Sequence, residues 1–416
     1  MQTSISENLK GTPEGQEAEA IVRSCVHCGF CLATCPTYQL LGDELDSPRG
    51  RIYLIKQVLE GAPVSEKTQL HLDRCLTCRA CETTCPSGVK YGRLIDIGRG
   101  IVEARVKRTP KAVLQRQALQ AVLSHKTVFK LFLKTAQAIR PLLPAHLRGK
   151  VPQTRGATPW PAPRHPRTML VLDGCAQPSL APNINTAAAR LLDRLGISLV
   201  KASGAGCCGA LKYHLNAQEA GLADMRRNVD AWWPQIKGGI EAIVSTASGC
   251  GVVMKDYGHL LASDLAYSAT ANQVGEMSRD IAEVVAAEKD PLLALLANLP
   301  ESGRRIRVAF QAPCTLQHGQ QIRGVVESLL TAAGFELTAV PNGHLCCGSA
   351  GTYSILQPEL SQQLLKNKVE ALESGKPDVI VTANIGCLTH VQSGTGIPVR
   401  HWVELLEERL AEPAAA

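Results

Sequence analysis

Two cysteine runs with identical spacing stand near the N-terminus of this chain. They are CVHCGFCLATCP, at 25–36, and CLTCRACETTCP, at 75–86, and each has the form C-x2-C-x2-C-x3-C-P. Cysteine thiolates are soft ligands that suit iron, and this spacing is typical of bacterial proteins that hold two cubane iron–sulfur clusters. The sequence therefore predicts two 4Fe-4S clusters between residues 25 and 86.

The predicted ligands form two crossed sets, because the fourth cysteine of each such run binds the cluster of the other run. Cluster 1 takes Cys25, Cys28, Cys31 and Cys85, and cluster 2 takes Cys75, Cys78, Cys81 and Cys35. Zinc also binds paired C-x2-C motifs, but a duplicated run of four cysteines followed by proline is not its usual form. Arg49 and Arg51, between the runs, could offset cluster charge or simply face solvent.

The other eight cysteines fall in an internal repeat. Each copy holds one cysteine, then a double cysteine followed by glycine, then one more cysteine, and equivalent cysteines lie 139, 139 and 137 residues apart. The two sets are Cys175, Cys207, Cys208 and Cys250, then Cys314, Cys346, Cys347 and Cys387. The runs and the repeat together account for all 16 cysteines, which favours ligand roles over scattered structural thiols.

Short apolar runs and helix-forming segments alternate within each copy. Strands are predicted at 168–175, 196–202 and 241–250 in the first copy and at 306–314, 334–340 and 377–387 in the second, with helices at 184–195 and 321–333. This alternation indicates parallel sheets, in which ligands bind at the carboxyl ends of the strands. Each set of four cysteines could there hold a further iron–sulfur cluster or a zinc ion, or nothing stable.

The predicted fold is an α+β multi-domain chain, with an N-terminal α-helical two-cluster ferredoxin domain and a C-terminal pair of α/β cysteine-rich repeats. The predicted divisions are a flexible arm (1–20), the ferredoxin domain (21–105), a helical and proline-rich linker (106–167), repeat 1 (168–300) and repeat 2 (301–416).

One motif in the first copy suggests a different chemistry. GAGCCG, at 204–209, has the spacing of a dinucleotide-binding loop, with Asp230 about 20 residues on. The second copy, GHLCCGSAG, keeps the cysteines and loses the first two glycines, so the thiols are the shared feature. Four histidines lie near the thiols and could be ligands or proton carriers, although a structural role is commoner; they are His214, His318, His344 and His390, of which His318 and His344 flank Cys314 and Cys346.

Composition narrows the class of protein further. The chain has 416 residues, 45% of them hydrophobic, with a net charge of +7 and no nucleic-acid-binding motif. The polar start does not resemble a secretory signal, and no apolar stretch reaches the ~20 residues of a membrane helix. We therefore expect a cytoplasmic protein. The basic and apolar segment 126–150 could dock on a membrane surface, although packing between the domains is the simpler explanation.

This order of domains resembles the iron–sulfur subunit of glycolate oxidase, over about residues 20–410. The strings CPTYQLLGDELDSPRGRIYLIKQVLEG and HLCCGSAGTYSILQPELS carry the resemblance most clearly. It implies a complex with flavin-containing subunits that oxidise glycolate to glyoxylate, while this chain, without catalytic residues of its own, passes electrons towards a membrane acceptor such as quinone. It also implies a location in the cytoplasm or peripheral to the cytoplasmic side of the inner membrane, and no nucleic-acid partner.

Related families leave alternatives open. The plan is also similar to iron–sulfur subunits of lactate utilisation, anaerobic glycerol-3-phosphate dehydrogenase and heterodisulfide reductase. The chain could therefore serve a lactate or glycerol-3-phosphate dehydrogenase complex, or catalyse at its repeats as heterodisulfide reductases do. The repeats depart from the heterodisulfide reductase pattern, because their last motifs, SGCG and IGCL, have one cysteine where that family has C-x-x-C. A zinc scaffold is the non-redox alternative.

Overall fold

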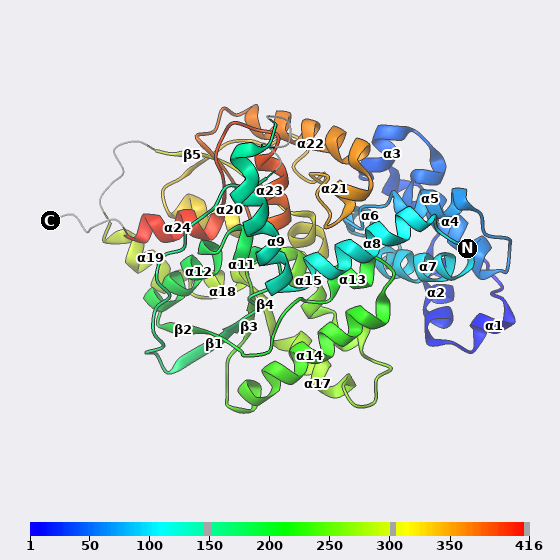
Figure 1. Cartoon of the computed structure of the whole chain (residues 1–416), viewed down its shortest axis with the longest axis horizontal. Coiled ribbons are helices and arrows are strands. Elements are labelled where there is room, and N and C mark those ends of the chain that lie inside the picture. Colours follow the sequence, from blue (N-terminus) through cyan, green and yellow to red (C-terminus); the bar gives the residue numbers. More distant parts are fainter. Residues whose placement is uncertain (145–147, 149–150, 300–304, 412–416) are drawn as a thin grey trace.

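A computed structural model describes residues 1–144, 148, 151–299 and 305–411. Figure 1 shows a helical N-terminal part at the right and two sheets flanked by helices in the rest of the molecule. The predicted fold class is confirmed: a helical domain with the two cysteine runs is followed by two α/β repeats.

The N-terminal domain is built from short helices around an apolar core. Side-chain caps begin several of them: Thr12 accepts a hydrogen bond from the Gly15 N–H at the start of α2, and Ser47 accepts one from Gly50 at the start of α4. The helices are α1 (Glu7–Lys10), α2 (Pro13–Ser24), η1 (Phe30–Leu32), α3 (Pro36–Leu41), η2 (Glu44–Asp46), α4 (Pro48–Leu59), α5 (Glu66–Asp73), α6 (Ala80–Thr84) and α7 (Tyr91–Arg105).

The first 20 residues do not form the expected flexible arm. They hold α1 and part of α2, and α2 packs on α4 and α7. Ile5, Ala18, Ile21 and Val22 are buried in the core of the domain. Three of them lie at helical spacing within a segment that is otherwise polar, so one narrow apolar stripe is enough to hold the arm in place.

Two helices follow the ferredoxin domain, and the second of them is amphipathic. They are α8 (Pro110–Leu123) and α9 (Lys126–Ile139), which pack against each other and are followed by η3 (Arg140–Leu142). We call α8, α9 and η3 the helical hairpin. Residues 151–166 then run without helix or strand to the first sheet. Among the described residues, none of the helices combines the length and the apolar character needed to cross a membrane.

Repeat 1 is a four-stranded parallel sheet in the order β2-β1-β3-β4. Its strands are β1 (Arg167–Val171), β2 (Ile197–Lys201), β3 (Ile243–Ser245) and β4 (Ser278–Asp280). Its helices are α11 (Gln177–Leu180), α12 (Asn183–Arg194), α13 (Ala210–His214), α14 (Gln218–Lys237), α15 (Ser248–Lys255), α16 (Tyr257–Leu260), α17 (Ser268–Met277), α18 (Ile281–Ala287) and α19 (Lys289–Ala297).

Repeat 2 has the same topology, with the order β6-β5-β7-β8 and all strands parallel. Its strands are β5 (Arg307–Gln311), β6 (Glu336–Leu337), β7 (Val379–Thr382) and β8 (Val399–His401). Its helices are η4 (Thr315–Gly319), α20 (Val325–Ala332), α21 (Tyr353–Leu356), α22 (Pro358–Glu373), α23 (Ile385–Gln392) and α24 (Trp402–Ala411).

The two repeats share one hydrophobic core. Apolar residues of β1 and α12 in repeat 1 pack in a continuous cluster with those of β5, β7 and α24 in repeat 2. Hydrogen bonds cross the same boundary: the hydroxyl oxygens of Ser248 and Thr315 are 2.8 Å apart, and the His401 ring donates to the main-chain oxygen of Thr246 at 2.9 Å. The repeats therefore form one body, which holds the eight cysteines of the repeat in fixed relative positions.

Candidate iron–sulfur sites

The two cysteine runs fold into loops of matched and strained conformation. His27 and Gly29 in the first run, and Thr77 and Arg79 in the second, all have positive φ, between 53° and 85°. A positive φ is unfavourable for a β-branched residue such as Thr77. In the second loop this conformation turns the Thr77 N–H towards the Cys75 sulfur, with nitrogen and sulfur 3.4 Å apart. Strain repeated at equivalent positions indicates a conformation that function requires.

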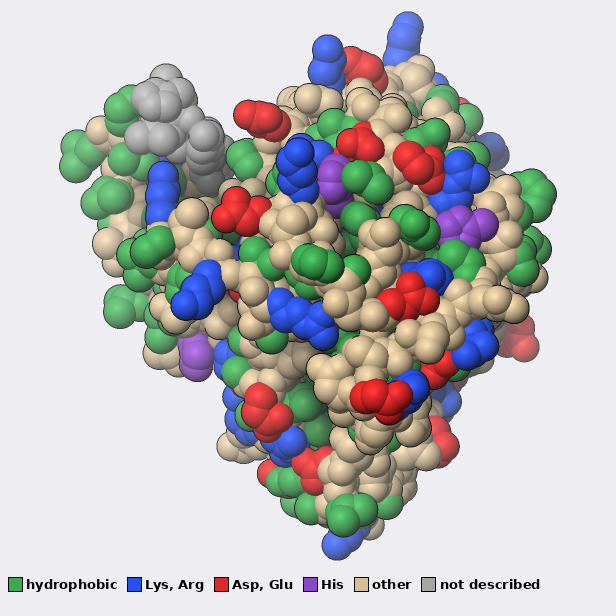
Figure 2. All heavy atoms as spheres, turned by 90° about the vertical axis from the view of Figure 1, so that its right-hand side faces the viewer, with side chains coloured by type: hydrophobic (Ala, Val, Ile, Leu, Met, Phe, Trp, Pro, Cys, Tyr) green, Lys and Arg blue, Asp and Glu red, His purple; other side chains and the backbone are tan. Residues whose placement is uncertain are grey.

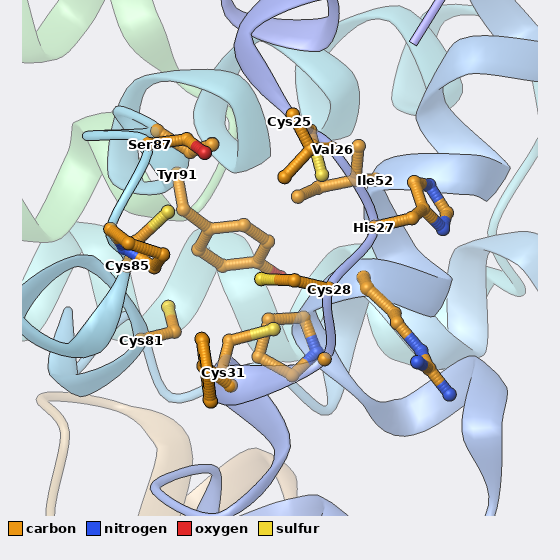
Figure 3. A pocket seen from close by; sticks show the side chains of 16 residues that line it. Cys25, Val26, His27, Cys28, Cys31, Ile52, Cys81, Cys85, Ser87 and Tyr91 are labelled. Carbon is orange, nitrogen blue, oxygen red and sulfur yellow. The ribbon is translucent and has the colours of Figure 1, made fainter.

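The first loop and two cysteines of the second run, Cys81 and Cys85, line a common hollow that is open to solvent and encloses about 420 Å³ of empty space. Figure 3 shows the sulfur-bearing side chains arranged around it, with the ring of Tyr91 between them. Its walls include all four residues predicted for cluster 1, namely Cys25, Cys28, Cys31 and Cys85. The donor set and the space fit a cubane cluster. Cys28 and its neighbours Val26 and Phe30 are exposed, so this site opens on the molecular surface.

A second hollow of about 310 Å³ adjoins the first. Its walls include the four residues predicted for cluster 2, namely Cys35, Cys75, Cys78 and Cys81. Cys81 and Tyr91 line both hollows, so the two sites are separated by little more than one side chain. The donor set of four thiols again fits a cubane cluster, and this site is the more deeply buried one, since Cys35, Cys75 and Cys81 are all buried.

Three of the thiols, Cys31 at the first site and Cys78 and Cys81 at the second, resist ionisation because their pKa values are raised. Burial raises the pKa of Cys31 to about 11 and raises the pKa values of Cys78 and Cys81 well above the ordinary thiol value. Neighbouring thiolates raise them further by repulsion. Bound iron removes both penalties, because a coordinated cation stabilises thiolates directly. These four-sulfur sets are therefore poorly suited to remaining as free thiolates and well suited to binding a metal centre.

A buried charge network supports the second site. The Arg51 side chain is 1% exposed and lies on the wall of that hollow. Its guanidinium donates to Asp46 and Thr37, each at 3.1 Å, and to the main-chain oxygen of His71 at 2.7 Å. Although burial alone lowers it, the pKa of Arg51 is raised by Tyr91, Cys75, Cys35 and Asp46. Of the two roles considered for this residue, compensation of cluster charge fits its position and the solvent-facing role does not.

The same network explains a group of acidic and histidine atoms that could suggest a cation site. Oxygen and nitrogen atoms of Asp43, Asp46 and His71 lie within 4.8 Å of one another. Asp46, however, already receives Arg51 at 3.1 Å and Arg74 at 2.8 Å. Two guanidinium groups on one carboxylate leave no electrostatic reason to bind a further cation there.

Arg99, from α7, fixes the second loop from the opposite side. Its guanidinium donates to the main-chain oxygens of Leu72 and Cys75, and to the Thr77 hydroxyl at 3.1 Å. The Tyr91 hydroxyl also donates to the Cys75 sulfur at 3.7 Å. These contacts hold the strained loop in place and direct donors towards a ligand sulfur, which is how proteins adjust cluster potentials.

The four cysteines of repeat 1 come together at the carboxyl end of its sheet. Cys175 follows β1, Cys207 and Cys208 follow β2, and Cys250 lies in the first turn of α15, after β3. Hydrogen bonds between thiols join them in the order Cys175, Cys207, Cys208, Cys250. The bonds from Cys175 and Cys208 lower the pKa of Cys207 to about 3, aided by the Gly209 N–H and the charge of Lys212.

Repeat 2 has the same arrangement. Cys314 follows β5, Cys346 and Cys347 follow β6, and Cys387 lies in α23, after β7. The thiols are joined in the order Cys314, Cys346, Cys347, Cys387, and the Cys314 and Cys346 sulfurs are 3.9 Å apart. Each repeat therefore brings together four soft donors from three loops. Such a set could bind a metal centre, and the predicted convergence of the cysteines agrees with this geometry.

The glycine after each double cysteine has a clear structural reason. Gly209 and Gly348 have φ values of 90° and 88°. A Cβ at Gly209 would lie 2.6 Å from the Gly221 oxygen, and one at Gly348 would lie 2.6 Å from the Ser361 oxygen. Only glycine lets the double-cysteine loop approach the following helix so closely. The glycine thus serves thiol placement, and no phosphate cradle is needed to explain the motif GAGCCG.

The four histidines differ in role. His318 joins two sites, because its Nδ1 lies 3.1 Å from the Thr83 hydroxyl of the second cysteine loop and its Nε2 donates to the main-chain oxygen of His344. His214 pairs with Asp96 of α7 at 3.0 Å, and His390 bonds Ser361 at 3.2 Å. These contacts are structural for His214 and His390, while burial lowers the pKa values of His318 and His344.

The second cluster site adjoins repeat 2 directly. Leu76 from the second cysteine loop is buried in one apolar cluster with Cys346 and Tyr353, and Cys78 and Cys314 pack against the same cluster. The Tyr353 hydroxyl donates to the main-chain oxygen of Arg74 at 3.1 Å. No local pattern predicts this contact, since Cys78 and Cys314 are far apart in the chain. It creates a continuous series of thiol sites, from the exposed Cys28 inward to repeat 2.

Sequence reasoning also missed a lysine beneath the thiols of repeat 2. Lys368 is buried, and its ammonium donates to the main-chain oxygens of Asn342 and Gly343, each at 3.2 Å. Burial lowers the pKa of Lys368, and the nearby thiols of the repeat oppose that shift. In repeat 1 the buried Asn228 of α14 makes different contacts: it accepts a hydrogen bond from the Gly206 N–H and donates one to the main-chain oxygen of Cys207. Aligning the helices after the double cysteines would have shown this lysine-for-asparagine difference.

Fold and donor sets together define a class: an iron–sulfur protein of the two-cluster ferredoxin type joined to two cysteine-rich domains. Comparison with known families agrees. Residues 21–89 match the 4Fe-4S dicluster domain, and residues 169–255 and 308–392 each match the cysteine-rich domain.

Known proteins narrow the class to one family. The chain is 55% identical over 411 residues, or 99% of both chains, to the glycolate oxidase iron-sulfur subunit of Escherichia coli (strain K12). It is 30% identical to the probable glycolate oxidase iron-sulfur subunit of Bacillus subtilis (strain 168), over 90% of this chain and 89% of that protein. Lactate utilization protein A of Bacillus licheniformis is 25% identical over 56% of this chain and 97% of its own length.

The chain belongs to the glycolate oxidase iron–sulfur subunit family. It is accordingly an iron–sulfur electron-transfer subunit of an oxidoreductase complex and works together with other subunits. The resemblance predicted from the order of its motifs is confirmed.

Proposed function

We propose that this chain carries electrons, one at a time, from a flavin subunit that oxidises glycolate to glyoxylate towards a membrane acceptor such as quinone. Glycolate oxidation releases two electrons and two protons, and reduction of a quinone to quinol consumes the same number. The flavin takes the electron pair, and each iron–sulfur cluster passes single electrons. The kinship with a glycolate oxidase subunit supports this choice of substrate over lactate or glycerol 3-phosphate.

The observation that best supports this electron route is the contact between the second cluster site and repeat 2. We propose that Cys25, Cys28, Cys31 and Cys85 bind cluster 1 and that Cys75, Cys78, Cys81 and Cys35 bind cluster 2. The two hollows share Cys81, and Cys78 packs beside Cys314 and Cys346. Electrons entering at the surface would then pass through cluster 1 and cluster 2 to the repeat 2 thiols, with each transfer between neighbouring sites.

The surface at cluster 1 supports electron entry there. Val26 and Phe30 stand exposed beside the exposed Cys28, and Arg49 lies on the same wall. Apolar side chains around an exposed cluster ligand suit a transient partner that must bring its flavin close. We therefore propose that the flavin subunit docks over residues 26–30.

A reconstitution experiment tests the proposal. Protein prepared anaerobically should contain at least about eight iron and eight acid-labile sulfide per chain, as two cubane clusters require. Electron paramagnetic resonance after partial reduction should show two interacting clusters. Cys28→Ser should alter the signal of cluster 1 while leaving cluster 2 in place, and Cys78→Ser should do the reverse. Colourless protein with bound zinc and no sulfide would refute the proposal.

A second experiment tests substrate and partner. The complex purified through a tag on this chain should contain a flavin subunit and should reduce a soluble quinone with glycolate. The same complex should reduce it much more slowly with lactate or glycerol 3-phosphate. Faster turnover with either of those substrates would assign the chain to the alternative complex instead.

A further inference from the structure

The net positive charge of this chain comes from one segment. Residues 104–172 contain 14 Lys and Arg and no Asp or Glu, whereas the rest of the chain contains 30 Lys and Arg against 37 Asp and Glu. The net charge of +7 therefore arises wholly from this segment. The helical hairpin, α8, α9 and η3, is its central part.

Helix α9 has two apolar faces, and the fold uses only one of them. Phe129 and Leu133 are buried on the face that packs against the rest of the protein. A second stripe follows the spacing of successive helical turns at Val128, Leu131 and Phe132 and continues at Ile139. On that stripe the side chains of Leu131 and Phe132 are 70% and 65% exposed.

Exposed apolar side chains continue beyond α9. Leu142 in η3 is 85% exposed, and Leu114 on α8 is 69% exposed. Figure 2 shows hydrophobic side chains standing out from the lobe that projects at its left edge, with Lys or Arg side chains among them. Scattered exposed leucines need no explanation, but a row of them on one helical hairpin marks a contact surface.

Lysines adjoin this stripe without acidic partners. Arg108 and Arg116 of the same segment are paired with Asp73. In the described part of the chain, by contrast, Lys111, Lys130 and Lys134 form no ion pair. The unpaired cations therefore lie on the two helices that expose the apolar stripe, and the surface combines hydrophobic contact with positive charge.

We propose that the helical hairpin lies on an anionic lipid bilayer, with α9 in the plane of the headgroups and its second apolar stripe among the acyl chains. A helix with an exposed apolar stripe flanked by lysines has the composition of an interfacial membrane helix. Its 14 residues are too few to cross the hydrocarbon core. Anionic headgroups supply the negative charge that Lys111, Lys130 and Lys134 lack within the protein.

The hairpin also packs on two short helices that follow cysteines of repeat 1. Helix α9 packs against α11, which begins two residues after Cys175, and Lys126 bonds Asp173 just before that cysteine. Helix α8 packs against α13, which begins two residues after Cys208. Because Arg116 of α8 also pairs with Asp73, two residues before Cys75, the hairpin joins repeat 1 and the ferredoxin domain. This membrane contact stands on charge and exposure alone and does not require the proposed electron route.

Vesicle flotation tests the proposal on the full chain with its clusters loaded. One set of vesicles contains phosphatidylglycerol and phosphatidylcholine, and the other contains phosphatidylcholine alone. The protein should float with the anionic vesicles at low salt, should be released at high salt, and should not float with neutral vesicles.

Two paired variants separate the contributions. Leu131→Gln with Phe132→Gln should lower the partition coefficient at least about tenfold. Lys130→Gln with Lys134→Gln should lower it about 30-fold and weaken its salt dependence. The matched control is Leu265→Gln with Lys366→Gln, in which a leucine that is 97% exposed lies between α16 and α17, away from the hairpin. This control should float like the parent protein.

The visible absorption of the clusters and the circular dichroism spectrum of each variant show whether it is folded. Absence of flotation by the folded parent protein, equal flotation of the hairpin variants and the parent, or equal binding to neutral and anionic vesicles would each overturn the proposal. None of these results bears on electron transfer, which is measured separately by cluster reduction in solution.

Discussion

Arg51 offers a direct test of how the protein sets the potential of the proposed cluster 2. Its buried guanidinium lies on the wall of that hollow and not on the wall of the other. In a medium with an effective dielectric constant of ~20, a unit positive charge about 5–10 Å from an added electron stabilises that electron by about 2–3 kcal/mol. Arg51→Met should therefore lower the potential of cluster 2 by roughly 100 mV, while cluster 1 shifts much less.

Asp46 should give a shift of the opposite sign. Its carboxylate is fully buried and pairs with Arg51 and Arg74. Asp46→Asn removes a negative charge but keeps a hydrogen-bond acceptor of the same shape, so it should raise the potential of cluster 2. Arg51→Lys retains the charge and should leave the potential close to that of the parent protein, although it loses the forked hydrogen bonds.

Potentials are measured by redox titration followed by electron paramagnetic resonance, with cluster 1 as the reference within each sample. Arg51→Met also leaves the Asp46 carboxylate short of one partner, which should cost about 3–5 kcal/mol of stability. Samples are therefore compared only where both cluster signals are retained in full. Shifts of the same sign in Arg51→Met and Asp46→Asn, or equal shifts of both clusters, would refute the electrostatic reasoning.

Three further predictions concern the repeats. Lys368→Met should destabilise repeat 2 by about 1–2 kcal/mol in urea unfolding, because two main-chain oxygens lose their donor, and Lys366→Met on the surface should have little effect. Burial lowers the pKa of His401 from 6.5 to about 4, so between these pH values the unfolded chain binds more protons than the folded protein does. The free energy of unfolding should therefore rise by about 3 kcal/mol from pH 4 to 6.5, and the rise should be smaller in His401→Gln. Asp256→Asn leaves Arg79 and Arg93 without their shared carboxylate, so proteolysis between the ferredoxin domain and repeat 1 should be faster.

Local patterns made the cysteine runs and the strands predictable. Ligand spacing within one loop is fixed by covalent geometry, and the apolar runs before Cys175 and Cys314 form the buried strands β1 and β5 as predicted. The edge strands β4 and β8 were not predicted, because SRD and VRH are three residues long and mostly polar. Their strand form depends on pairing with β3 and β7, which no local pattern reveals.

Long-range contacts account for what the sequence could not show. Arg51 is held in the interior by Asp46 and by the main-chain oxygen of His71. The residues next to Arg51 in sequence therefore could not show whether it compensates cluster charge or faces solvent. The contact of Cys78 with the repeat 2 thiols depends on how two domains pack. The N-terminal arm was predicted wrongly for a related reason: its few apolar residues suffice once α4 and α7 provide a surface to bury them.

The two repeats share a fold but differ in their surroundings, and from this difference we predict different tasks for them. Repeat 2 contacts the second ferredoxin site and carries the buried Lys368 beneath its thiols, whereas repeat 1 has neutral Asn228 at that place and lies under the helical hairpin. A cation near a redox centre favours its reduced form, so repeat 2 is suited to accept an electron from cluster 2. Exchange of the two residues, by Lys368→Asn with Asn228→Lys, should therefore slow electron transfer from cluster 2 to repeat 2. The potentials of the two ferredoxin clusters should change little. Unchanged transfer after the exchange would show that proximity alone, and not charge, directs the electron.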